Sequence, residues 1–278
     1  MDTTGFDSLH VTASDDGRIV RLRLDHGKAN EMGSEQLHEL TRLADRLRAS
    51  DAVALITTST KKSSRGTPIF QAGANVTERV GWADDAVKAH VRWQRDVLAD
   101  LRRAPVFHVV VVDGVALGWG TEFLLVGDYR IATPAARFAL PETGLGILPG
   151  AGGTSELWSQ IGAPHALRLG MTGERIDASE AQRIGLVQEL APDADAAVAR
   201  AEALAGLASR RSPTALAAFK GAVLDSVGAS EADRTEREAA AYEACVDAGE
   251  AAIGRAHFAA IRAGEVPPWS PRRRGGDR

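Results

Sequence analysis

Glu122 occupies a position where a carboxylate is unusual. It follows the sequence G-W-G-T at 118–121 and directly precedes the apolar run at 123–126. Glycines that follow a strand and precede an apolar segment predict a strand-to-helix turn, with Glu122 in the first turn of the helix. The unpaired N–H groups of a helix N-terminus stabilise a negative charge. A carboxylate among apolar residues must nevertheless be paired, protonated or functional, so a capping residue and a catalytic acid or base are both open.

Glu142 is the second unusual carboxylate. It lies in the run P-E-T-G-L-G-I-L-P-G-A-G-G-T at 141–154, where six of the ten residues from 144 to 153 are glycine or proline. Such a loop either approaches another backbone closely or frames a pocket. Alone, Glu142 reads as a surface loop residue. Because both glutamates follow neighbouring predicted strands, together they form a candidate acid/base pair.

A third segment, I-F-Q-A-G-A-N-V at 69–76, ends the loop after the first buried strand. Its small residues would let backbone N–H groups face a ligand. An ordinary tight turn is the alternative interpretation.

Several common catalytic arrangements are absent from the sequence. It contains no G-x-S-x-G, no H-E-x-x-H, no phosphate-binding G-x-x-x-x-G-K-[ST] and only one cysteine, Cys245. Two near-matches to the dinucleotide-binding G-x-G-x-x-G motif fail, because Phe123 and Pro149 occupy the third glycine position. The seven histidines are scattered. No metal site is therefore expected, and the glutamates remain the leading candidates.

The elements that must position these residues follow from the hydrophobic pattern. An Asp-Gly turn at 16–17 between alternating runs predicts a hairpin, and Ser34 is expected to cap a helix with apolar residues at helical spacing. Strands separated by helices predict an α/β protein with a mainly parallel core. The expected strands are 52–57, 106–112, 129–133 and 136–140, and a helix is expected over 84–103. Further helices are expected at 195–207, 213–227, 231–246 and 250–263.

This pattern predicts three parts: a core at 1–195, a C-terminal helical module at 196–269 and a disordered tail at 270–278. The net charge of −4 gives no indication of nucleic acid or an anionic membrane as a partner. No apolar run is long enough for a signal peptide or a membrane span. A single cysteine excludes an intrachain disulfide, so a reducing, cytoplasmic location is expected.

These motifs, in this order, resemble the crotonase (enoyl-CoA hydratase/isomerase) superfamily over roughly residues 6–269. Its A-G-A-D stretch is matched by A-G-A-N at 72–75, its G-G-G-x-E by 118–122, and its P-E-x-x-x-G-x-x-P-G-x-G-G-T by 141–154. Its K-x-N segment near CoA is similar to 28–30, and its later G-x-x-I-x-A…G-L-V signature to 173–178 and 185–187. The resemblance implies a spiral of ββα turns followed by a helical trimerisation module, with a homotrimer or a dimer of trimers as the assembly.

The resemblance also implies roles for particular residues. The backbone N–H groups of Ala74 and Trp119 would form an oxyanion hole, and Glu122 and Glu142 would be the catalytic pair. Ala72, Gly73, Asn75 and Gly118 would line the substrate site, with Lys28 and Ala29 near CoA and Phe258 as a contact from a neighbouring subunit. Trp119 and Asn75 depart from the family's glycine and aspartate, and the bulk of Trp119 is expected to reshape the acyl pocket. Trp82 and Trp93 are expected either to shape that pocket or only to pack a helix.

The implied activity is addition or removal of water across the α,β double bond of an acyl-CoA thioester. Two carboxylates sharing one proton suit this reaction, because repulsion raises the pKa of one of them. An enoyl-CoA isomerase and a specialised polyketide-type dehydratase of the same fold are the alternatives. A non-catalytic scaffold is disfavoured because both carboxylates are present. The chemistry is proton transfer, so no cofactor is expected beyond the CoA of the substrate.

Overall fold

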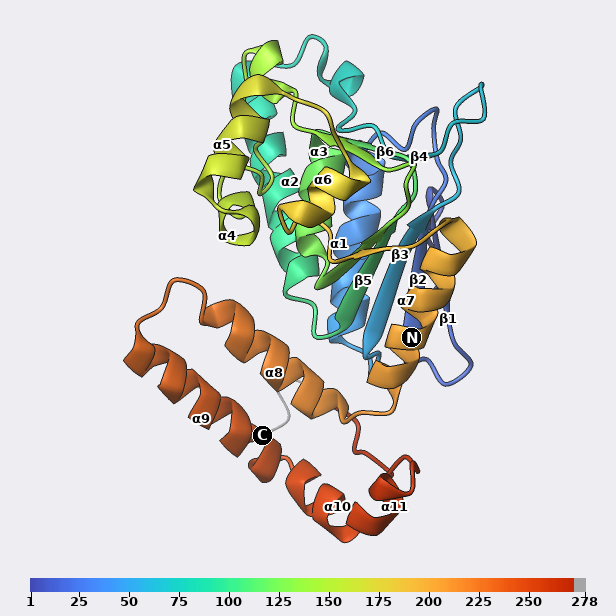
Figure 1. Ribbon diagram of the computed structural model, residues 1–278, viewed down its shortest axis with the longest axis vertical. Helices are drawn as coiled ribbons and strands as arrows, with labels where there is room; N and C mark the ends of the chain where they lie inside the picture. Colours follow the sequence, from blue (N-terminus) through green and yellow to red (C-terminus); the bar gives the residue numbers. More distant parts are fainter. Residues whose placement is uncertain (273–278) are drawn as a thin grey trace.

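The structure is a computed structural model of the chain, and it describes residues 1–272. Two sheets form its core (Figure 1). The larger has the strand order β1-β2-β3-β5-β7-β10; its strands are Leu9–Ala13, Ile19–Leu24, Ala54–Ser59, Phe107–Val112, Tyr129–Ala132 and Glu189–Leu190. The smaller has the order β4-β6-β8-β9; its strands are Ile69–Gln71, Val115–Leu117, Arg137–Ala139 and Ile176–Asp177.

The chain alternates between these sheets. β3, β5 and β7 are parallel neighbours in the larger sheet, and the strands that follow them, β4, β6 and β8, are parallel neighbours in the smaller one. Helices α2 (Asp84–Arg102) and α3 (Trp119–Phe123) then return the chain to the next turn. The result is the expected spiral of ββα turns.

The period-2 pattern of strands assigns each apolar side chain to one face of the larger sheet. Leu55 and Val110 pack towards α1 (Ser34–Arg48), whereas Ile56 and Val111 pack in the cluster that includes α7 (Ala194–Ser209). Burial on both faces explains why these strands are continuous apolar runs. The predicted β1–β2 hairpin is confirmed as an antiparallel pair.

Two details of the expected elements are wrong. Gly33, not Ser34, is the N-cap of α1; its N–H donates to Gln36 Oε1 at 3.0 Å. Gly118 was expected to follow the strand at 106–112 after a short interval that forms a turn, but that interval contains β6. Three-residue strands such as β4 and β6 carry too little periodicity to be seen in a sequence.

The remaining helices connect the strands or form the C-terminal region. Between β8 and β10 lie α4 (Leu157–Ile161), α5 (Ala163–Thr172) and α6 (Ala178–Arg183), and short 3₁₀ turns cover Val76–Arg79, Leu124–Val126 and Glu142–Leu145. After α7 come α8 (Pro213–Asp225), α9 (Glu231–Asp247), α10 (Glu250–Ala256) and α11 (Phe258–Arg262). The helix expected over 250–263 is thus interrupted at His257. No helix within residues 1–272 combines the length and apolar character needed to cross a membrane.

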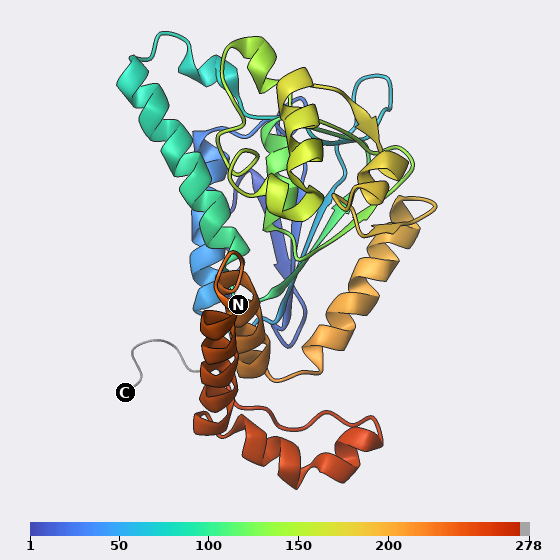
Figure 2. The same ribbon diagram turned by 60° about the vertical axis from the view of Figure 1, so that its left-hand side comes forward.

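The predicted boundary at 195/196 falls inside α7. This helix packs on the larger sheet through alanines at four-residue spacing, Ala197, Ala201 and Ala205, all fully buried. It belongs to the core, and the chain leaves the core after it. Helices α8–α11 extend away from the two sheets (Figures 1 and 2).

The C-terminal segment returns to the core and ends in a buried arginine. The Arg272 side chain is 8% exposed, and its guanidinium donates to the carbonyl oxygens of Leu47 and Pro105 at 2.7 and 2.8 Å and to that of Ser50. Its N–H donates to Asp51 Oδ1 at 2.8 Å. The disorder expected from residue 270 therefore does not hold for 270–272, because carbonyls left unpaired at the end of α1 bind the guanidinium. Residues 273–278 lie outside the described part of the chain.

Arg272→Ala should lower the free energy of unfolding by about 2–4 kcal/mol, since it leaves several buried carbonyls without their charged donor. Urea unfolding followed by circular dichroism measures the change. Arg262→Ala, which removes an exposed arginine from α11, is the matched control and should leave the midpoint almost unchanged. Equal midpoints for the two variants would contradict a structural role for Arg272.

Candidate active site

The candidate site lies where β4, β6 and β8 end. Because these strands are parallel neighbours, the segments that follow them meet at one edge of the smaller sheet. They surround a cavity of about 230 Å³. All three sequence motifs contribute to its wall, together with one face of α2; the lining includes Ala72, Gly73, Ala74, Arg79, Val91, Gln94, Gly118, Trp119, Glu122, Glu142, Leu145, Ile147 and Leu148.

Two backbone donors at the cavity are unoccupied. Trp119 is the first residue of α3, where an N–H has no intrahelical acceptor, and Ala74 lies in the loop after β4. Neither N–H has an acceptor among residues 1–272. Glycines allow the two segments to approach: Gly73 has a φ of +108°, and a Cβ there would lie 3.2 Å from the carbonyl oxygen of Leu117. Both residues expected to form the oxyanion hole therefore line the cavity, and their role stays a prediction.

Glu122 is fixed by a loop distant in sequence. Its side chain is 3% exposed, and its Oε1 accepts hydrogen bonds from the backbone N–H groups of Ala151 and Gly153 at 2.7 and 2.8 Å. A Cβ at Gly153 would lie 2.5 Å from Pro149 Cβ and 3.1 Å from that oxygen, which explains why a glycine suits this position. The glycine-rich loop thus fixes one of the two carboxylate oxygens of Glu122.

Burial raises the pKa of Glu122 to about 7. The two backbone donors oppose this shift, and the negative charge of Glu142 adds to it. A carboxylate with a pKa near neutrality can accept or release a proton at physiological pH.

Glu142 begins the 3₁₀ turn after β8 and lines the same cavity as Glu122. Burial raises its pKa too. Its Oε2 is buried without a hydrogen-bond partner among the described residues. A Cβ at Gly118 would lie 2.7 Å from Glu142 Oε1, so the carboxyl group is close to the chain segment that carries the Trp119 N–H. A buried carboxylate oxygen that accepts no hydrogen bond disfavours the negative charge, so the protonated form of Glu142 is favoured.

Glu122 should titrate near pH 7, which a carboxyl ¹³C titration can observe directly. Its raised pKa means that the folded protein binds a proton that the unfolded chain has already lost between about pH 4.5 and 7. The bound proton stabilises the folded state fully below this pH window. As pH rises through the window, the free energy of unfolding therefore falls by about 3 kcal/mol.

Glu122→Gln is the control for this titration. The resonance that titrates near pH 7 should disappear, and the difference in unfolding free energy between pH 5 and pH 8 should shrink. A wild-type spectrum in which every glutamate titrates below pH 5.5 would contradict the desolvated environment of Glu122.

The tryptophans divide between cavity and core. Trp119 lines the cavity but is only 3% exposed, and its ring packs against Phe123 with centroids 5.7 Å apart. Its bulk therefore goes mainly into the core. Trp82 and Trp93 do not line the cavity and instead pack edge-on against His90. Of the two interpretations offered for them, packing against the helix is the one that the structure shows.

Four of the residues expected at the substrate site do not line this cavity. Lys28 is exposed. The carbonyl oxygen of Ala29 accepts from the N–H of Ala72 at 3.0 Å and so links its own segment to the loop after β4. Asn75 turns its side chain to Thr77, whose hydroxyl donates to Oδ1 at 2.6 Å. Phe258 is 62% exposed on α11, a helix that lies apart from β4 and β6 (Figure 1).

Two polar residues of the cavity were not predicted from the sequence. Arg79 ends the 3₁₀ turn Val76–Arg79, and Gln94 lies on the buried face of α2. A polar residue on an otherwise apolar helix face was the available signal for Gln94. For Arg79 no sequence signal exists, because an arginine in a surface turn is usually solvated.

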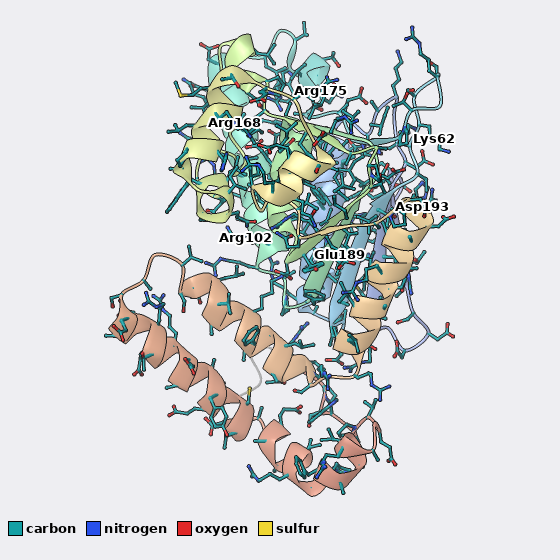
Figure 3. All side chains as sticks on the ribbon, in the orientation of Figure 1. Lys62, Arg102, Arg168, Arg175, Glu189 and Asp193 are labelled. Carbon is teal, nitrogen blue, oxygen red and sulfur yellow. The ribbon has the colours of Figure 1, made fainter. Side chains whose placement is uncertain are left out.

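A second cavity, of about 330 Å³, is also lined by Glu122. It is lined by Arg95 and Arg102 of α2 and by Leu224 of α8. Figure 3 labels Arg102 at the end of α2 that faces α8. Glu122 therefore borders both the cavity of the candidate site and the cavity next to α8.

Comparison with known proteins agrees with this geometry. Residues 15–265 match the family model described as enoyl-CoA hydratase/isomerase. YngF of Bacillus subtilis, named for enoyl-CoA hydratase/isomerase, is 36% identical over 216 residues, 77% of this chain and 81% of that protein. Human enoyl-CoA hydratase domain-containing protein 2 is 32% identical over 219 residues, 77% and 74% of the two chains.

A solved structure of an enoyl-CoA hydratase from Bacillus anthracis superimposes with a TM-score of 0.85 at 28% identity, covering 95% of this chain and 99% of that one. The matching fold includes the C-terminal helices as well as the two sheets. The chain belongs to the enoyl-CoA hydratase/isomerase family, the crotonase superfamily.

Proposed function

We propose that the protein is a hydratase, which adds water to, or removes it from, the α,β double bond of an acyl-CoA thioester. One observation carries the proposal: two glutamates with raised pKa values line one cavity together with Ala74 and Trp119, whose backbone N–H groups have no acceptor among the described residues. Hydration needs a base, an acid and stabilisation of an enolate oxygen. The cavity offers all three.

In the proposed reaction the thioester oxygen accepts hydrogen bonds from the N–H groups of Ala74 and Trp119. Glu122 takes a proton from water, and the resulting hydroxide forms a bond to the β-carbon. The electron pair of the double bond moves towards the thioester, and the enolate oxygen is stabilised by the two donors, by about 3–4 kcal/mol for each. Glu142 then gives its proton to the α-carbon, and proton exchange with solvent restores both carboxyl groups.

The roles follow from the surroundings of each carboxyl group. Glu122 Oε1 accepts two backbone hydrogen bonds, which favour the ionised form that a base requires. Glu142 has a buried oxygen without a donor, which favours the protonated form that an acid requires. These steps move protons only and call for no cofactor beyond the CoA of the substrate.

An isomerase that shifts the double bond from the 3,4 to the 2,3 position is the second candidate, and the family name of YngF includes it. Isomerisation needs only one group that moves a proton between two carbons. The presence of a second carboxyl group in the lining of the same cavity favours hydration.

Two substrates separate these activities. Crotonyl-CoA loses its conjugated-enoyl absorbance on hydration, whereas 3-hexenoyl-CoA gains it on isomerisation. We expect rapid loss with crotonyl-CoA and slow or no gain with 3-hexenoyl-CoA. Rapid gain with 3-hexenoyl-CoA and no loss with crotonyl-CoA would replace the hydratase by the isomerase.

We also propose that the protein assembles as a trimer or a dimer of trimers through its helical region. Large apolar side chains are exposed on α8 and α9, among them Phe219 at 72% and Tyr242 at 70%. Such contiguous apolar surface on a soluble chain marks an interface. Light scattering should give a mass of three or six chains, and a monomer would contradict the proposal.

A further inference from the structure

The wall of the active-site cavity contains a cation that the hydration mechanism does not use. Arg79 lines the cavity together with both glutamates, and its Nε and Nη2 atoms are buried without a hydrogen-bond partner among residues 1–272. It is the one cationic side chain among the described residues that line this cavity. Burying guanidinium N–H groups without an acceptor costs free energy. A ligand that accepts hydrogen bonds from them would offset this cost.

The neighbouring acid does not satisfy this guanidinium. Glu78 is adjacent in sequence, but its Oε2 accepts from the N–H of Ser34 at 3.1 Å and its Oε1 lies 3.3 Å from His90 Nε2. Its carboxylate is thus directed to the start of α1 and to α2. Arg79 keeps only a longer-range attraction to it, while burial lowers the pKa of Arg79.

A second unsatisfied donor lies in the same wall. Gln94 is 3% exposed, lines the cavity and has an Nε2 without an acceptor among the described residues. Buried side-chain amides normally have hydrogen-bond partners. Two buried donor groups without acceptors, one from the 3₁₀ turn and one from α2, therefore belong to residues that line one small cavity.

The free atoms of Arg79 identify the chemistry of the ligand. Nε–H and one Nη2–H form the side-on fork of a guanidinium, and their spacing matches the two oxygens of a carboxylate. Arg79 follows Ala74 by five residues, through a 3₁₀ turn that rises about 2 Å per residue. The cavity has a volume of about 230 Å³, which suits a short acyl group.

We propose that Arg79, assisted by Gln94, binds a carboxylate at the far end of the acyl group, so that the preferred substrates are CoA thioesters of short dicarboxylic acids. This rests on the proposed function in that it places an acyl-CoA in the cavity. Arg79 is then a specificity-determining residue, because it contacts the substrate at a distance from the reacting carbons. The exposed apolar residues of the cavity, such as Leu145 and Ile147, would contact the methylene groups between the reacting carbons and the terminal carboxylate.

The test compares two saturated ligands that cannot be hydrated, glutaryl-CoA and valeryl-CoA, which have acyl chains of five carbons and differ at the terminal group. Isothermal titration gives the dissociation constant of each. We expect wild type to bind glutaryl-CoA at least about tenfold more tightly, as for a hydrogen-bonded charge pair. Arg79→Met should abolish that preference, Arg79→Lys should keep part of it because the charge remains without the fork, and Gln94→Leu should reduce it.

Arg92→Met removes an exposed arginine from the same helix as Gln94 and is the matched control, with an unchanged preference. Circular dichroism confirms that each variant is folded. Equal affinities of wild type for the two ligands would overturn the proposal. So would an Arg79→Met variant that loses affinity equally for both, because that would place Arg79 at the CoA portion.

The outcome is separable from the proposed function. A preference for glutaryl-CoA that is lost in Arg79→Met supports the inference even if glutaconyl-CoA and crotonyl-CoA are not hydrated. Conversely, hydration of crotonyl-CoA by a protein without that preference supports the hydratase and overturns the dicarboxylate specificity.

Discussion

Glu122→Gln and Glu142→Gln should each lower kcat for hydration of crotonyl-CoA by about 10²–10⁴-fold, the usual contribution of a positioned acid or base. Glutamine keeps the shape of the side chain but can neither accept a proton from water nor deliver one to carbon. In the Glu122→Gln variant the amide oxygen can still accept the hydrogen bonds from Ala151 and Gly153, so the loop should keep its conformation. KM should change little.

The double variant Glu122→Gln/Glu142→Gln should be scarcely slower than either single variant. Groups that act as a unit have strongly non-additive effects, because removal of one already disables the other. Glu236→Gln, an exposed position on α9, is the control and should keep the wild-type rate. Single variants that retain more than a tenth of the wild-type kcat would exclude the paired mechanism.

Gly118→Ala should lower kcat by about 10²-fold or more without removing any functional group. Gly118 has a φ of +54°, which strains any other residue, and a Cβ there would lie 2.7 Å from Glu142 Oε1. The methyl group must therefore push back Glu142 or shift the N–H of Trp119. A displacement of about 1 Å in an active site is enough for a loss of this size. Backbone strain should also lower the free energy of unfolding by about 1–3 kcal/mol.

Gly206→Ala on α7 is the matched control. It adds the same methyl group at a helical glycine with no atom within 4 Å of the new Cβ. We expect unchanged kcat and a gain of about 0.5–1 kcal/mol in stability, because alanine is the better helix former. Steady-state kinetics and urea unfolding measure both effects. A Gly118→Ala enzyme with normal kcat would show that the contact with Glu142 is dispensable.

The sequence was enough to single out the two glutamates, but not the arrangement that brings them to one cavity. Glu122 and Glu142 could be identified because glycine-rich turns and apolar runs surround them. The second sheet could not, since β4 and β6 are three residues each and show no alternation. Without that sheet, nothing in the residues alone places the loop after β4 beside the start of α3.

Other features depend on contacts between distant parts of the chain. The buried Arg272 binds carbonyls that lie 167 and 225 positions away, which no local pattern encodes. The alanines of α7 indicated a helix, but only the sheet shows that they pack in the core. Arg79 has the sequence context of a solvated surface residue, and its role emerges only from the cavity around it.

Single-turnover hydration in H₂¹⁸O is the measurement that tests the mechanism most directly. We expect wild type to convert crotonyl-CoA to 3-hydroxybutyryl-CoA with one ¹⁸O at the hydroxyl group, and the double variant to form none of it on the same timescale while still binding the substrate. Equal ¹⁸O incorporation by wild type and the double variant would contradict the roles of Glu122 and Glu142. A wild-type enzyme that binds crotonyl-CoA but leaves it unchanged would contradict hydration itself.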